Sequence, residues 1–258
     1  MSQPLWFYWG EKTMSFLRYM TLRSACRIHD DVTLIIRNEP AEVSLKWIEK
    51  QDFMFKSDTK NWYDDAVKLP LKIVYLDDIA PEIANLRADG VHTSDLLSWW
   101  ILAQHGGTVC DMDIVFLKPL PKIQNNVEVV RYRYTCMNVD YFPIAYMQGH
   151  PDPKWKLSYD NAMRSYDPNV YQSCGAENLR PYPEPILPSN IVYPWVKYRW
   201  GQTLEFCFQE DVWPAIPGNC IGIHWYAGAT QHHNQSIQGP EDLTIGAIAW
   251  AVREVLRG

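Results

Sequence analysis

The chain has 258 residues, of which 47% are hydrophobic and 21% charged, and its formal net charge is −6. This length allows one large domain or two small ones, with the composition of a globular protein that buries an ordinary core. The acidic balance argues against a surface that tracks nucleic-acid phosphates, with a local basic groove around Arg131 and Arg133 as the open alternative.

Two further features of the composition bear on function. The 12 Trp and 15 Tyr indicate an aromatic-rich core, and two or three of them would be enough to form platforms for sugar rings or bases. The six cysteines are scattered and form no C-x-x-C motif, which favours reduced thiols. No signal peptide is evident, and no stretch approaches the roughly 18 apolar residues of a membrane span.

The N-terminal half alternates between predicted strands and helices. Strands are predicted over residues 5–9, 31–37 and 71–79, and a helix with a possible Ser15 cap follows Gly10. Continuous apolar strands separated by a helix are typical of a parallel sheet that is covered on both faces.

A second helix is predicted to open at the Thr-Ser-Asp sequence of residues 93–95 and to close at Gly106 and Gly107. Residues 108–117, TVCDMDIVFL, follow as the next predicted strand.

Beyond residue 120 the pattern weakens. Residues 120–200 are rich in Pro and Tyr, and we expect loops and short elements there, within the same domain, because no linker separates them. Residues 220–229, CIGIHWYAGA, predict a strand and a turn, and residues 240–257 predict a helix with Pro240 near its first position. Residues 1–258 are therefore expected to form one α/β domain.

Asp111 and Asp113 are two charges inside this otherwise apolar predicted strand. Alternate residues of a strand point to the same face, so the two carboxylates would share a buried face and repel each other. A hard divalent cation or a strand end open to solvent would relieve this, and oxygen ligands at the carboxyl end of a strand suit Mg²⁺ or Mn²⁺. D-x-D alone is a weak motif, and a solvated turn with two acids is the alternative.

The block at roughly residues 93–120, which contains SDLLSWWILAQHGGTVCDMDIVFLKPL, resembles the helix, Gly-Gly and D-x-D segment of GT-A nucleotide-sugar glycosyltransferases. It is most similar to the retaining family known for a sugar-binding region containing a D-x-D motif, with mannosyltransferase-like and clostridial-toxin-like groups. Weaker similarity lies in WFYWGEKTMSFLRYMTLRSA, MQGHP, SCGAENL and GIHWYAGATQHHN.

This resemblance implies a GT-A fold, Rossmann-like with a mostly parallel sheet flanked by helices. It implies a metal-dependent, retaining enzyme of the hexosyltransferase type that uses Mn²⁺ or Mg²⁺ and a UDP- or GDP-sugar. Residues 1–120 would form the nucleotide-sugar half, and residues 121–258 the acceptor side with a closing loop and helix. The acceptor would be a saccharide, a protein, a small molecule or a modified nucleobase. With no membrane anchor and no evident protein partner, we expect a cytoplasmic enzyme of bacterial or viral origin.

The resemblance also implies roles for single residues. Asp113 would bind the metal directly, Asp111 would reach the metal through water or contact the ribose, and His224 would be the third metal ligand. The catalytic group would be Asp95, Asp111 and Asp113, with no protein nucleophile and front-face attack by the acceptor hydroxyl. The donor would be held by Trp9 against the base, by Ser94 and Asp95 at the helix start, and by Trp225 and Gly228 near the diphosphate.

Two positions depart from the family pattern. Ser98 stands where these enzymes usually carry an Arg that helps to hold the donor, and Ala176 replaces a common Pro. One alternative function is a metal-dependent phosphohydrolase or nuclease that uses the two Asp and His224. The other is a non-catalytic protein that binds carbohydrate or nucleotide. His232 and His233 are expected to lie in a solvated loop.

Overall fold

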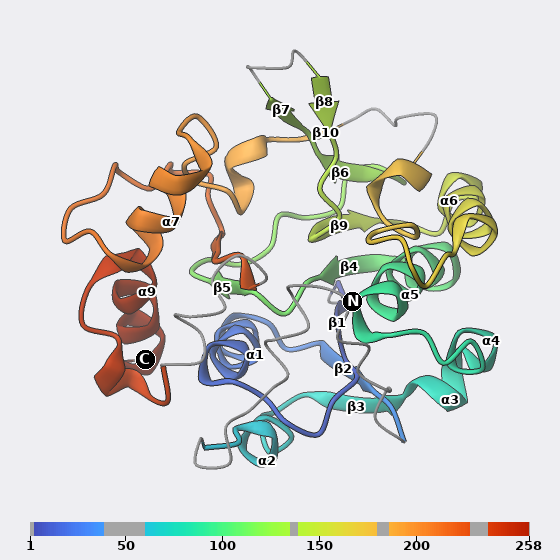
Figure 1. Ribbon diagram of the computed structural model, residues 1–258, viewed down its shortest axis with the longest axis horizontal. Coiled ribbons are helices and arrows are strands. Elements are labelled where there is room, and N and C mark those ends of the chain that lie inside the picture. The colour runs from blue at the N-terminus through green and yellow to red at the C-terminus, as the bar shows by residue number, and fades with distance from the viewer. Residues whose placement is uncertain (1–2, 39–59, 135–138, 180–185, 228–236, 258) are drawn as a thin grey trace.

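The computed structural model describes residues 3–38, 60–134, 139–179, 186–227 and 237–257 (Figure 1). In these ranges a central seven-stranded sheet has the order β10-β6-β9-β4-β1-β2-β3. Strands β1 to β4 run parallel, whereas β9 runs antiparallel to both of its neighbours. The sheet strands are β1 (Leu5–Trp9), β2 (Val32–Ile36), β3 (Lys72–Tyr75), β4 (Gly107–Cys110), β6 (Glu128–Val130), β9 (Tyr146–Gly149) and β10 (Ile186–Leu187).

Helices cover both faces of this sheet (Figure 1). On one face lie α1 (Phe16–Ile28) and α9 (Gly246–Arg257), with α7 (Trp200–Phe208) beside α9, and on the other lie α5 (Gly90–Gln104) and α6 (Pro153–Ser165). The prediction of an α/β protein with a mostly parallel sheet flanked by helices is confirmed. The smaller elements are β5 (Ile114–Phe116) with β11 (Gly222–His224), β7 (Tyr132–Tyr134) with β8 (Val139–Tyr141), α2 (Tyr63–Ala66), α3 (Leu76–Ile79) and α4 (Pro81–Ala84), with 3₁₀ turns at Ala176–Asn178, Ser189–Ile191 and Pro240–Asp242.

The alternation of side chains along β1 divides the core into two clusters. Leu5, Phe7 and Trp9 pack with α1 and α9, whereas Tyr8 points to the other face and packs with α5. The last two residues of β1 therefore approach the carboxyl edge of the sheet from opposite faces.

The first two predicted strands and the first helix are confirmed, with the Ser15 hydroxyl accepting the N–H of Arg18 at 3.4 Å. The third strand ends at Tyr75, and residues predicted to continue it form α3 instead. The predicted start of the second helix is wrong. Asp89 caps α5 by accepting the N–H of His92, so Asp95 lies in the second turn and not in the first.

The predicted strand over residues 108–117 is wrong in one decisive respect, because it is two strands. β4 ends at Cys110 in the central sheet, and β5 begins at Ile114 and pairs with β11. Asp111 makes the last bond to the central sheet, from its N–H to the carbonyl of Ala145 at 2.9 Å. The two carboxylates therefore lie in a connection at a strand end and not along a buried strand.

The second half of the chain holds more regular structure than expected. β9 enters the centre of the sheet, and α6 begins at Pro153 after an Asp152 cap. The predicted C-terminal helix is a 3₁₀ turn followed by α9, which starts at Gly246. The five cysteines in the described ranges are free thiols. Among the described helices, none combines the length and apolar composition needed to cross a lipid bilayer.

Gly107 offers a test of how the end of α5 is joined to β4. Its φ is +101°, and an added Cβ would lie 2.7 Å from the Pro4 carbonyl oxygen and 2.9 Å from Nε1 of Trp6. We expect Gly107→Ala to lower the free energy of unfolding by about 2 kcal/mol or more, because it combines backbone strain with overlap. Gly201→Ala is the control, since nothing lies within 4 Å of its added Cβ, and it should change stability by less than about 1 kcal/mol. Urea unfolding measures both, and equal stabilities of the two variants would contradict this account.

Candidate functional site

A cavity of about 180 Å³ lies at the carboxyl ends of β1 and β4. The chain runs from β1 outward to β2 and β3 on one side and returns to β4 on the other, so the cavity lies where the strand order reverses. Open α/β sheets bind ligands at such a point. The described side chains around it include Tyr8, Trp9, Glu11, Arg18, Ser94, Asp95, Asp111, Met112, Asp113, Ile144, Tyr171 and Gln172.

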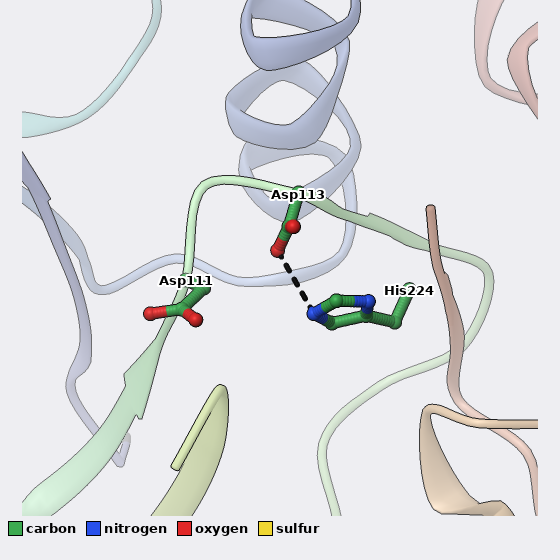
Figure 2. Close-up of side chains that lie close together, drawn as sticks. All are labelled: Asp111, Asp113 and His224. Carbon is green, nitrogen blue, oxygen red and sulfur yellow. Dashed lines mark ion pairs between the residues drawn. The ribbon is translucent and has the colours of Figure 1, made fainter. Parts of the chain in front are cut away.

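Asp111, Asp113 and His224 converge (Figure 2), and the two carboxylates line this cavity. Each offers one ligand atom, and these atoms all lie within 4.8 Å of one another. The pairing of β5 with β11 explains this proximity, because it places His224 opposite Ile114 and so beside Asp113. Residues that are far apart in the sequence are therefore brought together by one short antiparallel ladder.

Backbone groups of the turn after β11 hold Asp113 in place. Its carbonyl accepts the N–H of Trp225 at 2.9 Å, and its Oδ2 accepts the N–H of Ala227 at 2.9 Å. Its Oδ1 lies 3.1 Å from Nε2 of His224 and accepts no hydrogen bond of good geometry from the described residues. A buried carboxylate oxygen in this position suits a cation.

Electrostatics keep this carboxylate charged. Burial by itself raises the pKa of Asp113, but its neighbour His224, the charge of Arg18 and the N–H of Ala227 hold that pKa below its usual range. Asp113 is therefore ionised at neutral pH, as a metal ligand must be. Asp111 is half-buried beside it and offers a second carboxylate oxygen near the same point.

His224 fits this donor set less directly. Its Nδ1 accepts the N–H of Tyr226 at 3.2 Å, and Tyr226 adopts a left-handed backbone with a φ of +57°. In the neutral ring the proton then resides on Nε2, which faces Asp113. To bind a cation through Nε2, the ring has to release the Tyr226 contact and carry its proton on Nδ1. The two carboxylates thus fit a hard divalent cation as they stand, and His224 fits one after this local change.

The structure distributes the other predicted contacts unevenly. Trp9, Ser94 and Asp95 line the cavity, whereas Trp225 is fully buried and its side chain is not part of the cavity wall. Ser98 donates its hydroxyl to the Ser94 carbonyl at 2.8 Å and does not line the cavity either. Gly228, His232 and His233 lie outside the described residues.

The absence of a side chain at Gly175 leaves room for the carboxylate of Asp95. A Cβ added to Gly175 would lie 3.2 Å from Oδ2 of Asp95 and 3.1 Å from Cβ of Gln172. The segment SCGAENL therefore packs closely against the second turn of α5.

Several residues of the cavity wall escaped the sequence analysis. Arg18 does carry a sequence signal, because a cation in the first turn of a helix opposes the helix dipole. Tyr8 and Glu11 flank Trp9 and Gly10 in the sequence. Gln172 has a φ of +56°, a strained conformation that the amino-acid sequence around it does not indicate.

Comparison with known proteins leaves the family open. No protein-family model matches the chain, and no curated protein does. One similar solved structure is described as "PaToxG Glycosyltransferase", with a TM-score of 0.48 and 15% identity over 69% of this chain and 67% of that chain. Two others are a transferase mutant (TM-score 0.43, 12% identity, 70% and 85% coverage) and a transferase (0.42, 12%, 70% and 84%). These scores and identities are too low to assign a family or an activity.

The site generates a prediction about cation binding. We expect Asp113→Asn and Asp111→Asn each to weaken Mn²⁺ binding by roughly tenfold or more, because each removes a charged oxygen ligand. Asp160→Asn is the control, since this residue of α6 pairs with Lys156 and does not line the cavity. Titration of free Mn²⁺ by electron paramagnetic resonance measures the affinities. Equal affinity in all three variants would show that the pair is a solvated turn.

Proposed function

We propose that this chain is a metal-dependent, retaining glycosyltransferase that transfers a hexose from a nucleotide sugar to an acceptor hydroxyl. One observation carries the proposal: Asp111 and Asp113, which converge with His224, line the same cavity as Ser94 and Asp95 from α5. The sequence resemblance around these residues gives the same assignment.

In this proposal Asp111 and Asp113 hold Mn²⁺ or Mg²⁺, with His224 as a further ligand. The cation would neutralise the charge of the nucleoside diphosphate that leaves the sugar. The protein's own contribution is to keep both carboxylates in position, through the N–H groups of Trp225 and Ala227 on Asp113 and the Asp111 bond to Ala145. The two carboxylates then need little reorganisation when the donor enters, and the local change is confined to the His224 ring.

Asp95 and Ser94 would bind the donor sugar. A buried carboxylate that accepts from sugar hydroxyls is stabilised by those bonds and orients the ring at the same time. The cavity of about 180 Å³ is smaller than the roughly 300–1,000 Å³ of a site that encloses a drug-sized ligand. It would hold the sugar and phosphate region, with the base against Trp9 nearer the rim.

The two predicted halves keep their roles in this proposal. Residues 1–120 supply Trp9, Asp95, Asp111 and Asp113, and residues 121–258 supply His224 and the acceptor side. No side chain is assigned as a protein nucleophile. We propose front-face attack by the acceptor hydroxyl, with the leaving phosphate taking its proton.

A two-metal phosphohydrolase is less well supported. Among the described residues, Asp111, Asp113 and His224 form the one group whose ligand atoms are close enough to share an ion. A second cation would need further carboxylates at a similar distance.

A donor screen tests the proposal. Thermal shift with UDP- and GDP-sugars, with and without Mn²⁺, should find one donor that stabilises the protein only when the cation is present. A ligand at 100 times its dissociation constant adds about 2.7 kcal/mol to the free energy of unfolding, which is readily detected. Asp113→Asn should lose both this stabilisation and the release of nucleoside diphosphate from that donor.

The alternatives give different outcomes in the same experiment. A phosphohydrolase would release phosphate from generic phosphoesters without a sugar. A non-catalytic binding protein would be stabilised by the donor but would release no nucleoside diphosphate. If none of the donors stabilises the protein while it remains folded, the proposal is wrong.

A further inference from the structure

Arg18 occupies a position that helix stability does not explain. It lies in the first turn of α1, where its N–H is accepted by the Ser15 hydroxyl that caps the helix. The start of a helix carries a partial positive charge, so a guanidinium there is disfavoured relative to an acidic or neutral residue. The side chain of Arg18 instead lines the cavity described above.

Two tryptophans position the guanidinium of Arg18. It lies 4.7 Å from the ring centroid of Trp9 and 5.8 Å from that of Trp225. Both rings are themselves buried, Trp9 with its Nε1 bonded to the Thr13 carbonyl at 3.0 Å. Cation–π contact with fixed rings restrains a side chain that would otherwise be mobile. The charge is therefore presented to the cavity in a restricted position.

An anion can bind in this cavity only if a positively charged group offsets the negative charges of its wall. Glu11, Asp95, Asp111 and Asp113 all line the wall, and Arg18 is the one basic residue among its described side chains. A diphosphate entering this cavity would be repelled by the carboxylates, and a divalent cation held by two of them offsets only part of that repulsion. A planar guanidinium, with its fork of N–H donors, matches phosphate oxygens in geometry as well as in charge.

We propose that Arg18 binds the diphosphate of the donor together with the cation, and that it makes the site prefer diphosphate over monophosphate ligands. This inference rests on the proposed function for the identity of the donor. The anion site itself depends on Arg18, Trp9 and Trp225, and it can be tested without a sugar.

The test uses the full chain with three variants. Arg18→Met keeps the length of the side chain and its packing on Trp9 but removes the charge, and Arg18→Lys keeps the charge but loses the fork. Arg23→Met is the matched control, because Arg23 lies on the same helix and contacts the Tyr19 hydroxyl at 3.2 Å. Isothermal titration calorimetry in Mn²⁺ measures the affinity for inorganic pyrophosphate, UDP, GDP, UMP and GMP.

For Arg18→Met we expect roughly 10- to 100-fold weaker binding of pyrophosphate and of whichever nucleoside diphosphate binds the wild type. Binding of the monophosphates should fall less, about threefold or below, and Arg18→Lys should lie between Arg18→Met and the wild type. Mn²⁺ affinity measured by electron paramagnetic resonance should not fall, because Arg18 supplies no ligand to the cation and its positive charge opposes cation binding.

Several results would overturn this inference. Unchanged pyrophosphate affinity in Arg18→Met, an equal loss in Arg23→Met, or no pyrophosphate binding by the wild type would each do so. If the wild type transfers sugar and Arg18→Met does so equally well, the inference fails and the proposed function stands. If Arg18→Met loses pyrophosphate while the wild type accepts no nucleotide sugar, the proposed function fails and the anion site stands.

Discussion

The pairing of β5 with β11 is the interaction on which the candidate site depends. Its register sets His224 opposite Ile114, and the turn that follows directs the N–H groups of Trp225 and Ala227 onto Asp113. Without this three-residue ladder, Asp113 would be a charged residue without support at the end of a strand. With it, the carboxylate is buried, hydrogen-bonded and aimed at a common point with its partners. A small sheet outside the main one thus determines the geometry of the proposed chemistry.

The second constraint is the concentration of negative charge at one edge of the main sheet. Parallel strands β1 and β4 end together there, and the carboxylates of Asp95, Asp111 and Asp113 are gathered within one cavity wall. Like charges at such distances are stable only with a compensating cation or a shifted pKa. In this protein the pKa of Asp113 is lowered and not raised, with Arg18 among the causes. Arg18 and the proposed metal thus share one electrostatic role, because each offsets carboxylate charge and so favours an anionic ligand.

The layout of the N-terminal half followed well from local pattern, because apolar strands, a Ser cap and a Gly-Gly stop are local signals. The start of α5 did not, since Asp89 and the residues 93–95 offer competing caps and only packing selects between them. The break between Cys110 and Ile114 was also missed, because apolar residues continue on both sides of it. The cost of two carboxylates on one buried face nevertheless indicated either a divalent cation or a strand end, and the structure has a strand end there. α6 and β9 were not predicted, because the Pro- and Tyr-rich sequence of this region obscures their hydrophobic periodicity.

By itself, the sequence determined the α/β alternation, the electrostatic conflict posed by the carboxylate pair, and the residues of the motif that resembles GT-A enzymes. These follow from apolar periodicity and from the cost of burying charge, which act over a few neighbouring residues. The tertiary structure alone decided that β5 leaves the main sheet, that the Tyr226 N–H holds the His224 ring, and that Trp225 lies behind Arg18 and not on the cavity wall. These depend on contacts between segments far apart in the chain, and such contacts leave no signature in any one of the segments.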